Sequence, residues 1–295
     1  MRLRYYTVDV FTKRPFLGNP AAVVLLNQDL SNELYFKVAA EFNLSDTAFV
    51  KPLDADSFES AEQFSIRWFT PTTEVALCGH ATLASAHVLF TALGCEKSKV
   101  RLETRKSGTL YCSKNTDLSN RVVMNFPQFK DIVEIDHSTK SKEVAGDLKV
   151  AAVHYSATAT MLVVVLEQTH SIGQLQSLSP SKDALLALHD GKNLEGVAVT
   201  VQGSLENGCI DEMGVVYDFV SRFFVPWSGV AEDPATGSLH CMLGPMWSKY
   251  LKKTEFYSFQ AFPGRGAEFR LKLLDNGRID IIGDAVTITE GYLTC

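Results

Sequence analysis

Residues 232–238, E-D-P-A-T-G-S, combine a signal for the start of a helix with groups that could hold an anion. Asp233 is a common N-cap residue and proline a common first helical residue, so we expect a helix to begin there. The small residues Thr236 and Gly237 would leave backbone N–H groups open to a carboxylate or phosphate, which the helix dipole also attracts. Asp233 and Ser238 would place a titratable carboxylate and a hydroxyl beside that anion. The alternative is an ordinary capped helix without a ligand.

A second stretch of the chain resembles the first. R-F-F-V-P at residues 222–226 matches R-W-F-T-P at residues 67–71, an offset of 155 residues. The same offset lays the anion motif over L-C-G-H-A-T-L at residues 77–83 and places Asp233 over Cys78. We therefore predict a duplicated chain, in which two strand-loop-helix units present their helix starts to one cleft between the half-chains.

The stretch at residues 77–83 adds further candidate residues. His80 stands at the start of an Ala-rich apolar segment that predicts a buried helix to about residue 93. It could donate a hydrogen bond to an oxyanion or move a proton near neutral pH, with Cys78 and Gly79 beside the same anion. Arg265, in a G-R-G turn, is either an anion clamp or a solvated surface arginine. The local spacing of His, Cys and carboxylate residues suggests no metal site.

Asp46 is the remaining candidate. Ser31 is expected to cap an amphipathic helix that ends near Asn43, and residues 48–50 form a strand, so Asp46 lies in a short polar turn between two elements. A carboxylate at such a position can carry function. The alternative is that Ser45 and Asp46 only shape the turn through hydrogen bonds to the backbone.

The surrounding pattern predicts strands joined by turns, with one further helix in the second half at residues 181–189. We place a domain boundary in the polar segment 113–120, which gives halves 1–118 and 119–295, the C-terminal strand being free to pack back on the first half. The expected strands lie near residues 5–11, 21–26, 64–69, 109–112, 121–125, 151–154, 161–167, 196–200 and 213–224, with strands and turns over 259–273 and 278–289.

Composition limits the class of protein. The chain has 295 residues, 46% of them apolar, which is enough for one large or two medium domains. Its net charge of −6 argues against nucleic acid and anionic membranes as partners and favours a small molecule. The six cysteines form no C-x-x-C pair and are expected to be reduced thiols. The first residues lack an apolar signal core, and the longest aliphatic run, 161–166, is too short to span a membrane, so we expect a soluble cytoplasmic protein.

Five stretches of the chain together match a known family. They are D-V-F-T-x-x-P-F-x-G-N-P-A-A-V (9–23), N-L-S-D-T-A-F-V (43–50), F-T-P-x-x-E-V-x-L-C-G-H-A-T (69–82), E-D-P-A-T-G-S (232–238) and, more loosely, Q-x-x-P-G-R-G (260–266). With these stretches the chain resembles the PhzF family of phenazine biosynthesis-like proteins, especially its animal members. The resemblance implies an α+β, diaminopimelate-epimerase-like fold of two pseudo-symmetric domains, each with a curved β-sheet around a buried helix and with the active site between them. It also implies a homodimer that needs no cofactor.

The resemblance also implies roles. A glutamate in N-L-S-E-T of the family moves a proton on a small cyclic carboxylic acid, assisted by the histidine of G-H and the aspartate and serine of D-P-A-T-G-S. The matching residues here are Asp46, His80, Asp233 and Ser238. Asp46 departs from the family because its side chain is one methylene shorter. That sets its carboxylate back by more than roughly 1 Å, which can lower a rate about a hundredfold.

Three functions remain open from the sequence. The first is an isomerase that uses Asp46 to take a proton from carbon and return it elsewhere, with the substrate carboxylate held near Gly79 and Gly237. The second is a racemase or epimerase with two opposed thiols, for which Cys78 could supply one, although the repeat places Asp233 opposite it. The third is a binding or scaffold protein that kept the fold and lost efficient catalysis, for which the shorter Asp46 is the main support.

Overall fold

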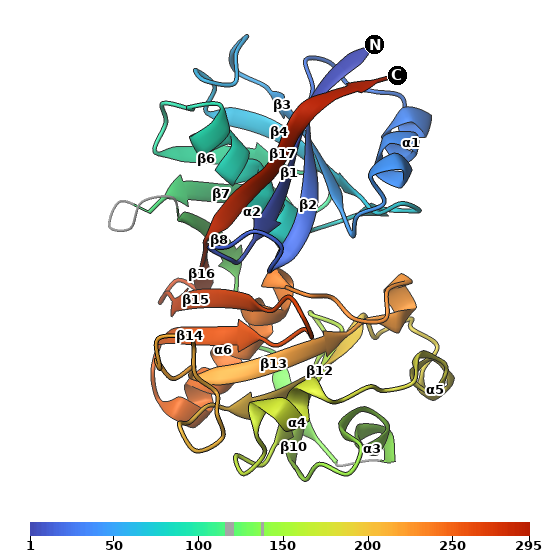
Figure 1. Cartoon of the computed structure of the whole chain (residues 1–295), viewed down its shortest axis with the longest axis vertical. Helices are drawn as coiled ribbons and strands as arrows, with labels where there is room; N and C mark the ends of the chain where they lie inside the picture. The colour runs from blue at the N-terminus through green and yellow to red at the C-terminus, as the bar shows by residue number, and fades with distance from the viewer. Residues whose placement is uncertain (116–120, 137–138) are drawn as a thin grey trace. The chain divides into compact units, whose positions relative to one another are not determined.

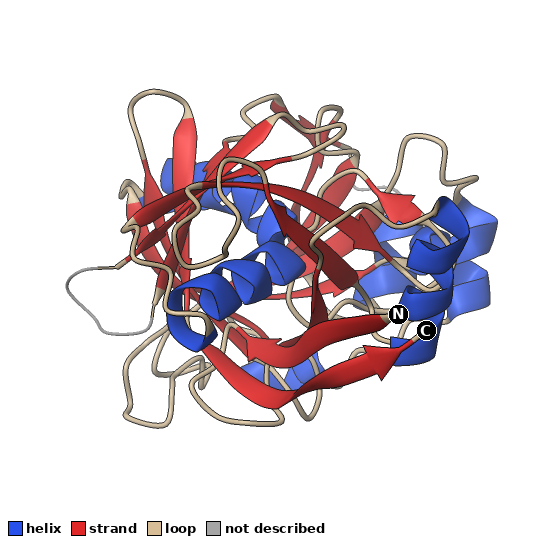
Figure 2. Ribbon diagram, turned by 90° about the horizontal axis from the view of Figure 1, so that it is seen from above, coloured by secondary structure: helices blue, strands red, loops and turns tan. Residues whose placement is uncertain are grey.

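The computed structural model describes residues 1–115, 121–136 and 139–295. They form two compact units, Met1–Phe126 with Asp280–Cys295, and Pro127–Ile279. The predicted boundary between residues 118 and 119 lies outside the described residues. Strands account for most of the regular structure, as the red ribbons of Figure 2 show. Among the described residues, no helix combines the length and apolar composition that a membrane crossing requires.

The first unit is a mixed sheet that includes both ends of the chain. Strand β17 pairs antiparallel along the length of β1, and Figure 1 shows the two running side by side. From β17 the order is β17-β1-β2-β3-β4-β6-β7-β8. The bounds are β1 Arg2–Val10, β2 Asn19–Leu25, β3 Thr47–Pro52, β4 Gln63–Phe69, β5 Glu74–Val75, β6 Lys99–Glu103, β7 Thr109–Lys114, β8 Val122–Pro127, β16 Arg278–Gly283 and β17 Ala285–Thr294.

Two helices accompany this sheet. Helix α1, Asn32–Phe42, begins as predicted, because the Ser31 hydroxyl accepts a hydrogen bond from the Leu34 backbone. It ends at Asn43, which adopts the left-handed conformation common at helix ends. Helix α2, Gly79–His87, continues as a π-helical turn over Val88–Ala92, and every residue of α2 is buried. The predicted buried helix is therefore confirmed.

The second unit, Pro127–Ile279, contains the strand order β9-β10-β11-β12-β13-β14-β15. Strand β13 is shorter than predicted, because the Asp211 carboxylate accepts hydrogen bonds from the Met213 and Val215 backbones and holds that segment in a turn. The bounds are β9 Ile132–Ile135, α3 Thr139–Ala145, β10 Val150–Ser156, β11 Met161–Leu166, α4 Ile172–Gln176, α5 Lys182–Leu188, β12 Gly196–Gln202, β13 Phe219–Phe224, a 3-10 turn Pro226–Ser228, α6 Gly237–Leu251, β14 Glu255–Gln260 and β15 Ala267–Leu273.

The two units repeat one topology. Read from β17 in the first unit and from β9 in the second, six successive pairings are antiparallel, antiparallel, parallel, antiparallel, parallel and antiparallel. Each unit also has a largely buried helix after its fifth strand in that order, α2 after β4 and the short β5 in one unit and α6 after β13 in the other. The duplication predicted from the five-residue match thus extends over nearly all of both sheets.

The predicted start of α6 is wrong. The helix begins at Gly237 with Thr236 at the N-cap, rather than at Asp233. The chain before it stays extended, because Glu232 forms a bridge with Phe224 and the Asp233 backbone donates to the Phe223 carbonyl at 3.0 Å. Gly237 therefore lies 158 residues after the first residue of α2, and the uniform offset of 155 fails at the helix starts.

Candidate active site

The turn between β1 and β2 positions a buried amide side chain, that of Asn19. Gly18 has a φ of +64°, and a Cβ there would lie 2.0 Å from the Val10 carbonyl oxygen, so the turn requires glycine. The Asp9 carboxylate braces the same turn by accepting a hydrogen bond from the Phe16 backbone at 2.7 Å. Asn19, the first residue of β2, is fully buried as a result.

A carboxylate, a thiol and an imidazole meet in the first unit. The Cys78 thiol donates to the Asp46 Oδ2 at 3.3 Å and lies 3.3 Å from the His80 Nδ1. Asp46 immediately precedes β3, Cys78 is the N-cap of α2, and His80 is its second residue. All three are buried. With Asn19 and Ser45, whose contacts follow, we call this group the Asp46 cluster.

Ser45 fixes the tautomer of His80. Its hydroxyl donates to the Asn19 Oδ1 at 3.3 Å, and its oxygen lies 3.2 Å from the His80 Nε2. Burial lowers the pKa of His80 to about 3, so the ring is neutral near pH 7 and carries one N–H. That N–H is assigned to Nε2, which donates to Ser45. The Nδ1 lone pair therefore faces the Cys78 thiol, and the thiol proton has two neighbouring acceptors, Asp46 and His80.

The start of α2 adds an electrostatic feature to this cluster. The first backbone hydrogen bond of the helix is from the Thr82 N–H to the Cys78 carbonyl at 3.2 Å. The N–H groups of Gly79, His80 and Ala81 precede it and lie at the positive end of the helix dipole. A carboxylate beside them would be stabilised, which suits an anionic substrate.

A second polar group precedes α6, and we call it the Asp233 cluster, made of Asp233, Thr236 and Gln260. The Thr236 hydroxyl donates to the Asp233 Oδ2 at 2.5 Å. Gln260, the last residue of β14, accepts from the Thr236 backbone N–H at 2.8 Å and donates to the Asp233 carbonyl at 2.6 Å. Gly237 is buried and Ser238 half-buried at the first two positions of α6.

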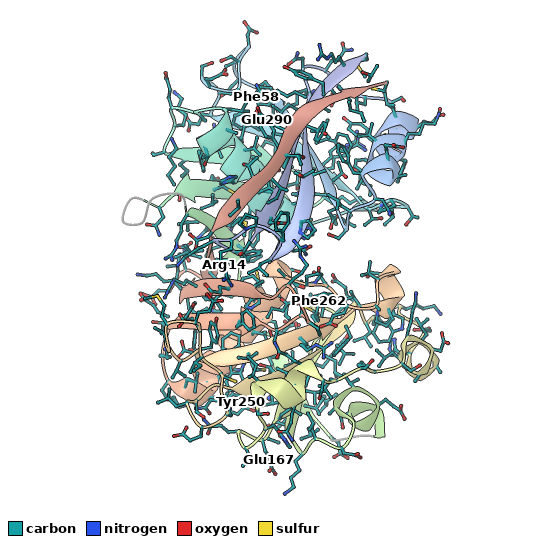
Figure 3. All side chains as sticks on the ribbon, viewed as in Figure 1. Arg14, Phe58, Glu167, Tyr250, Phe262 and Glu290 are labelled. Carbon is teal, nitrogen blue, oxygen red and sulfur yellow. The ribbon has the colours of Figure 1, made fainter. Side chains whose placement is uncertain are left out.

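The structure brings some predicted residues together and adds others. Asp46, Cys78, Gly79 and His80 form one group in the first unit, and Asp233, Thr236, Gly237 and Ser238 form another in the second. Arg265 lies in the turn between β14 and β15, where its backbone N–H donates to the carbonyl of Phe262, which Figure 3 labels. Sequence reasoning missed Asn19, Gln260 and the role of Ser45 toward His80. The signal was present in G-N-P, which we interpreted as a turn, and in Q-x-x-P-G-R-G, a loose match to the family of which only Arg265 was a candidate site residue.

The helix starts of the two units now align by structure. Thr236 takes the N-cap position that Cys78 has in α2, Gly237 matches Gly79, and Ser238 matches His80. The sequence offset had placed Asp233 opposite Cys78. The residue at the equivalent position is thus a threonine, and the thiol is not repeated.

The arginine of each repeated motif fixes the segment before the helix. In the first unit Arg67 donates to both oxygens of Glu74, at 2.7 and 2.9 Å. In the second unit Arg222 donates to both oxygens of Glu232, at 2.7 and 2.6 Å. Glu232 directly precedes Asp233, so this ion pair positions the Asp233 cluster.

The buried histidines make stability depend on pH. Burial lowers the pKa of His80 to about 3 and the pKa values of His87 and His240 to about 4. Each of these rings binds a proton near pH 6.5 in the unfolded chain and stays neutral at that pH in the folded chain. The contribution of the neutral rings to the free energy of unfolding is therefore fully present above pH 6.5. It is lost as the pH falls toward 4, by up to about 1.4 kcal/mol per pH unit for each ring.

Urea unfolding at a series of pH values checks this expectation. His87→Gln can keep a hydrogen bond to Thr287, whose hydroxyl lies 3.1 Å from the His87 Nε2, while removing one titrating ring. Below pH 6.5, we expect the slope of the free energy of unfolding against pH to be smaller in this variant, by the amount that corresponds to the uptake of one proton. An identical slope in both proteins would show that His87 is not held neutral by burial.

The fold defines the class of protein first. A duplicated α+β chain with a buried helix in each unit has the diaminopimelate-epimerase-like fold. A hydroxyproline epimerase from Agrobacterium vitis, solved with bound trans-4-OH-L-proline, shares this fold with a TM-score of 0.57 and 12% identity, over 99% of this chain and 92% of that one. The family follows from closer matches: the chain belongs to the PhzC-PhzF family of phenazine biosynthesis-like proteins, whose family model matches residues 8–291.

Full-length relatives support that assignment. The phenazine biosynthesis-like domain-containing protein 1 of Mus musculus is 40% identical over 100% of both chains. A protein of Pseudomonas aeruginosa named as an uncharacterized isomerase is 38% identical over 99% of both. The crystal structure of a PhzF-family protein from Enterococcus faecalis matches with a TM-score of 0.85 and 31% identity, over 100% of both chains.

Proposed function

We propose that the protein is a cofactor-independent isomerase that moves a proton on a small carboxylic acid. The observation that carries the proposal is the contact of the Cys78 thiol with both the Asp46 carboxylate and the His80 ring at the start of α2. These are acid-base groups placed beside helix amides that attract a carboxylate. A relative named as an isomerase and an epimerase with the same fold support the reaction class.

In the proposed reaction Asp46 removes a proton from a carbon of the substrate and, once protonated, returns it to another position. The negative charge that develops on the substrate is stabilised by the N–H groups at the start of α2. His80 stays neutral, and its ring holds the Cys78 thiol beside Asp46. In the second unit, Asp233 and Ser238 are proposed to orient the substrate by hydrogen bonds, and Thr236, Gly237 and Arg265 to hold its carboxylate.

A second candidate is a mechanism in which Cys78 itself is the acid or base. It is favoured by the position of the thiol between Asp46 and His80, both at 3.3 Å. Symmetrical chemistry with two thiols is disfavoured, because Thr236 stands at the equivalent N-cap. Cys78→Ser decides between the candidates. Full turnover in this variant would remove the thiol mechanism, and complete loss with Asp46 unchanged would favour it.

A ligand screen followed by product analysis tests the proposed function. Carboxylic acids that bind at about a hundred times their dissociation constant should stabilise the folded chain by about 2.7 kcal/mol, which a thermal-shift assay detects. We expect NMR spectra of a stabilising acid incubated with the protein to show a shifted double bond or an inverted stereocentre. If every stabilising acid is recovered unchanged, the binding-protein function is the better account.

Gly237→Val tests the anion-binding role of the α6 start. A branched side chain at the first position of this helix would stand beside the N–H groups that we propose to hold the substrate carboxylate. We expect stabilisation of the folded chain by inorganic sulfate or by a screened acid to fall at least tenfold in apparent affinity. A variant that is less stable but binds both anions as tightly as the native chain would contradict this role.

A further inference from the structure

The donor atoms of Asp46, Cys78 and His80 all lie within 4.8 Å of one another in a buried part of the first unit. A thiol, an imidazole and a carboxylate are the ligand types that zinc prefers in proteins, whereas magnesium and calcium favour oxygen alone. We propose that these three side chains bind a zinc ion and that the ion inhibits the proton transfer described above. The inhibitory part rests on the proposed function, and the binding part does not.

The two edges that meet at Cys78 fit a tetrahedral site, and the Asp46 Oδ2 lies 3.8 Å from the nearest ring nitrogen of His80, Nε2. Zinc–ligand lengths of about 2.3 Å to sulfur and about 2.0 Å to nitrogen or oxygen place neighbouring ligand atoms about 3.3–3.6 Å apart. The Cys78 Sγ lies 3.3 Å from the Asp46 Oδ2 and 3.3 Å from the His80 Nδ1, so both of its edges are close to the required length. Three protein ligands leave a fourth position for water or for a carboxylate oxygen.

A second, independent feature is the support of His80. A histidine that binds metal through one ring nitrogen usually donates the other N–H to a neighbouring acceptor, which orients the ring. The Ser45 oxygen lies 3.2 Å from the His80 Nε2, and the Ser45 hydroxyl is itself directed to the Asn19 Oδ1 at 3.3 Å. With the proton on Nε2, the lone pair on Nδ1 faces the Cys78 thiol at 3.3 Å and is available to a metal beside that sulfur.

The charges also balance. Binding replaces the proton of the Cys78 thiol with zinc and releases that proton to solvent, giving one thiolate, one carboxylate and one neutral imidazole around a divalent cation. The net charge of the occupied site is zero, which suits a buried position better than an unpaired charge does. Coordination to the cation lowers the basicity of the whole Asp46 carboxylate, so it becomes a much weaker acceptor of a proton from carbon. Zinc is therefore an inhibitor of this chemistry.

Titration of the protein with Co2+, a spectroscopic substitute for zinc, tests the site. We expect d–d bands typical of four-coordinate cobalt and a sulfur-to-cobalt charge-transfer band, both displaced by one equivalent of Zn2+. Cys78→Ser, Asp46→Asn and His80→Gln should each lose the bands or weaken binding, and Ser45→Ala should weaken it about 10–100-fold. Cys295→Ser is the matched control, because Cys295 is an exposed thiol, and it should leave the spectrum unchanged.

Three results would overturn the proposal. The first is a native protein without the charge-transfer band, and the second is a band that persists in Cys78→Ser and disappears in Cys295→Ser. The third is proton exchange that continues undiminished when one equivalent of Zn2+ is bound, which removes the inhibitory role. Because the optical signal needs no turnover, failure of the metal site and failure of the isomerase function are separately visible.

Discussion

Asp46→Asn is expected to lower the rate of proton exchange on a bound carboxylic acid by about 10²–10⁴-fold, the range that a positioned general base contributes. Asparagine keeps the size of the side chain and can still contact the Cys78 thiol, so the cluster should keep its shape. It cannot accept a proton from carbon. The measurement is the rate of solvent deuterium incorporation in D2O, followed by NMR at saturating ligand.

Asp46→Glu is the matched control for this substitution. It keeps the carboxylate and adds the methylene that the PhzF resemblance implies, so exchange should persist at a measurable rate. Both variants should retain the thermal shift given by the ligand, since we propose that the helix amides rather than Asp46 hold the substrate carboxylate. Unchanged exchange in Asp46→Asn would remove Asp46 from the mechanism and direct attention to Cys78.

Arg222→Met is expected to lower the free energy of unfolding by about 3–5 kcal/mol, as removal of one partner of a buried ion pair does. The Arg222 side chain is 4% exposed and that of Glu232 11%. Besides binding both oxygens of Glu232, Arg222 donates to three backbone carbonyls at the end of α4, those of Leu175, Gln176 and Leu178. Methionine fills a similar volume and leaves the carboxylate and these carbonyls without that donor.

Lys37→Met provides the control for that experiment, because it also exchanges a cation for methionine. Lys37 pairs with Glu33 at 2.6 Å on the surface of α1, and their side chains are 68% and 75% exposed. Water screens such a pair, so we expect a loss below about 1 kcal/mol in the same urea titration. Equal losses in the two variants would mean that burial does not strengthen the contribution of Arg222. Activity should also fall in Arg222→Met, because Glu232 adjoins Asp233.

The sequence predicted the fold well where local signals agree with tertiary packing. Ser31 and Asn43 mark the ends of α1, and the apolar segment after Cys78 is the buried helix α2. The prediction misplaced the start of α6, because D-P at residues 233–234 is a strong local signal for a helix start. In the structure the Asp233 backbone instead donates to Phe223, and Thr236 becomes the N-cap. Long-range pairing decided this boundary, and no local pattern carries that information.

The candidate site was predicted only in part for a similar reason. Asp46 and Cys78 are 32 residues apart, so spacing along the chain could not indicate that their side chains meet. The same separation hides the proposed metal ligands, because the local spacing of His, Cys and carboxylate residues around Cys78 does not include Asp46. Gln260 reaches Asp233 and Thr236 only through the pairing of β14 with β13. The homodimer, the absence of a cofactor and the shared action of both clusters on one ligand stay predictions.

Deuterium wash-in by the native protein tests the isomerase function most directly. A carboxylic acid that stabilises the folded chain is incubated with the protein in D2O, and its C–H signals are followed by NMR. The proposed proton transfer predicts that one C–H signal decays with enzyme-dependent kinetics while deuterium enters at that carbon or at the carbon that receives the proton. Saturating binding with every C–H signal retained would contradict proton transfer and leave a binding protein with the fold of an isomerase.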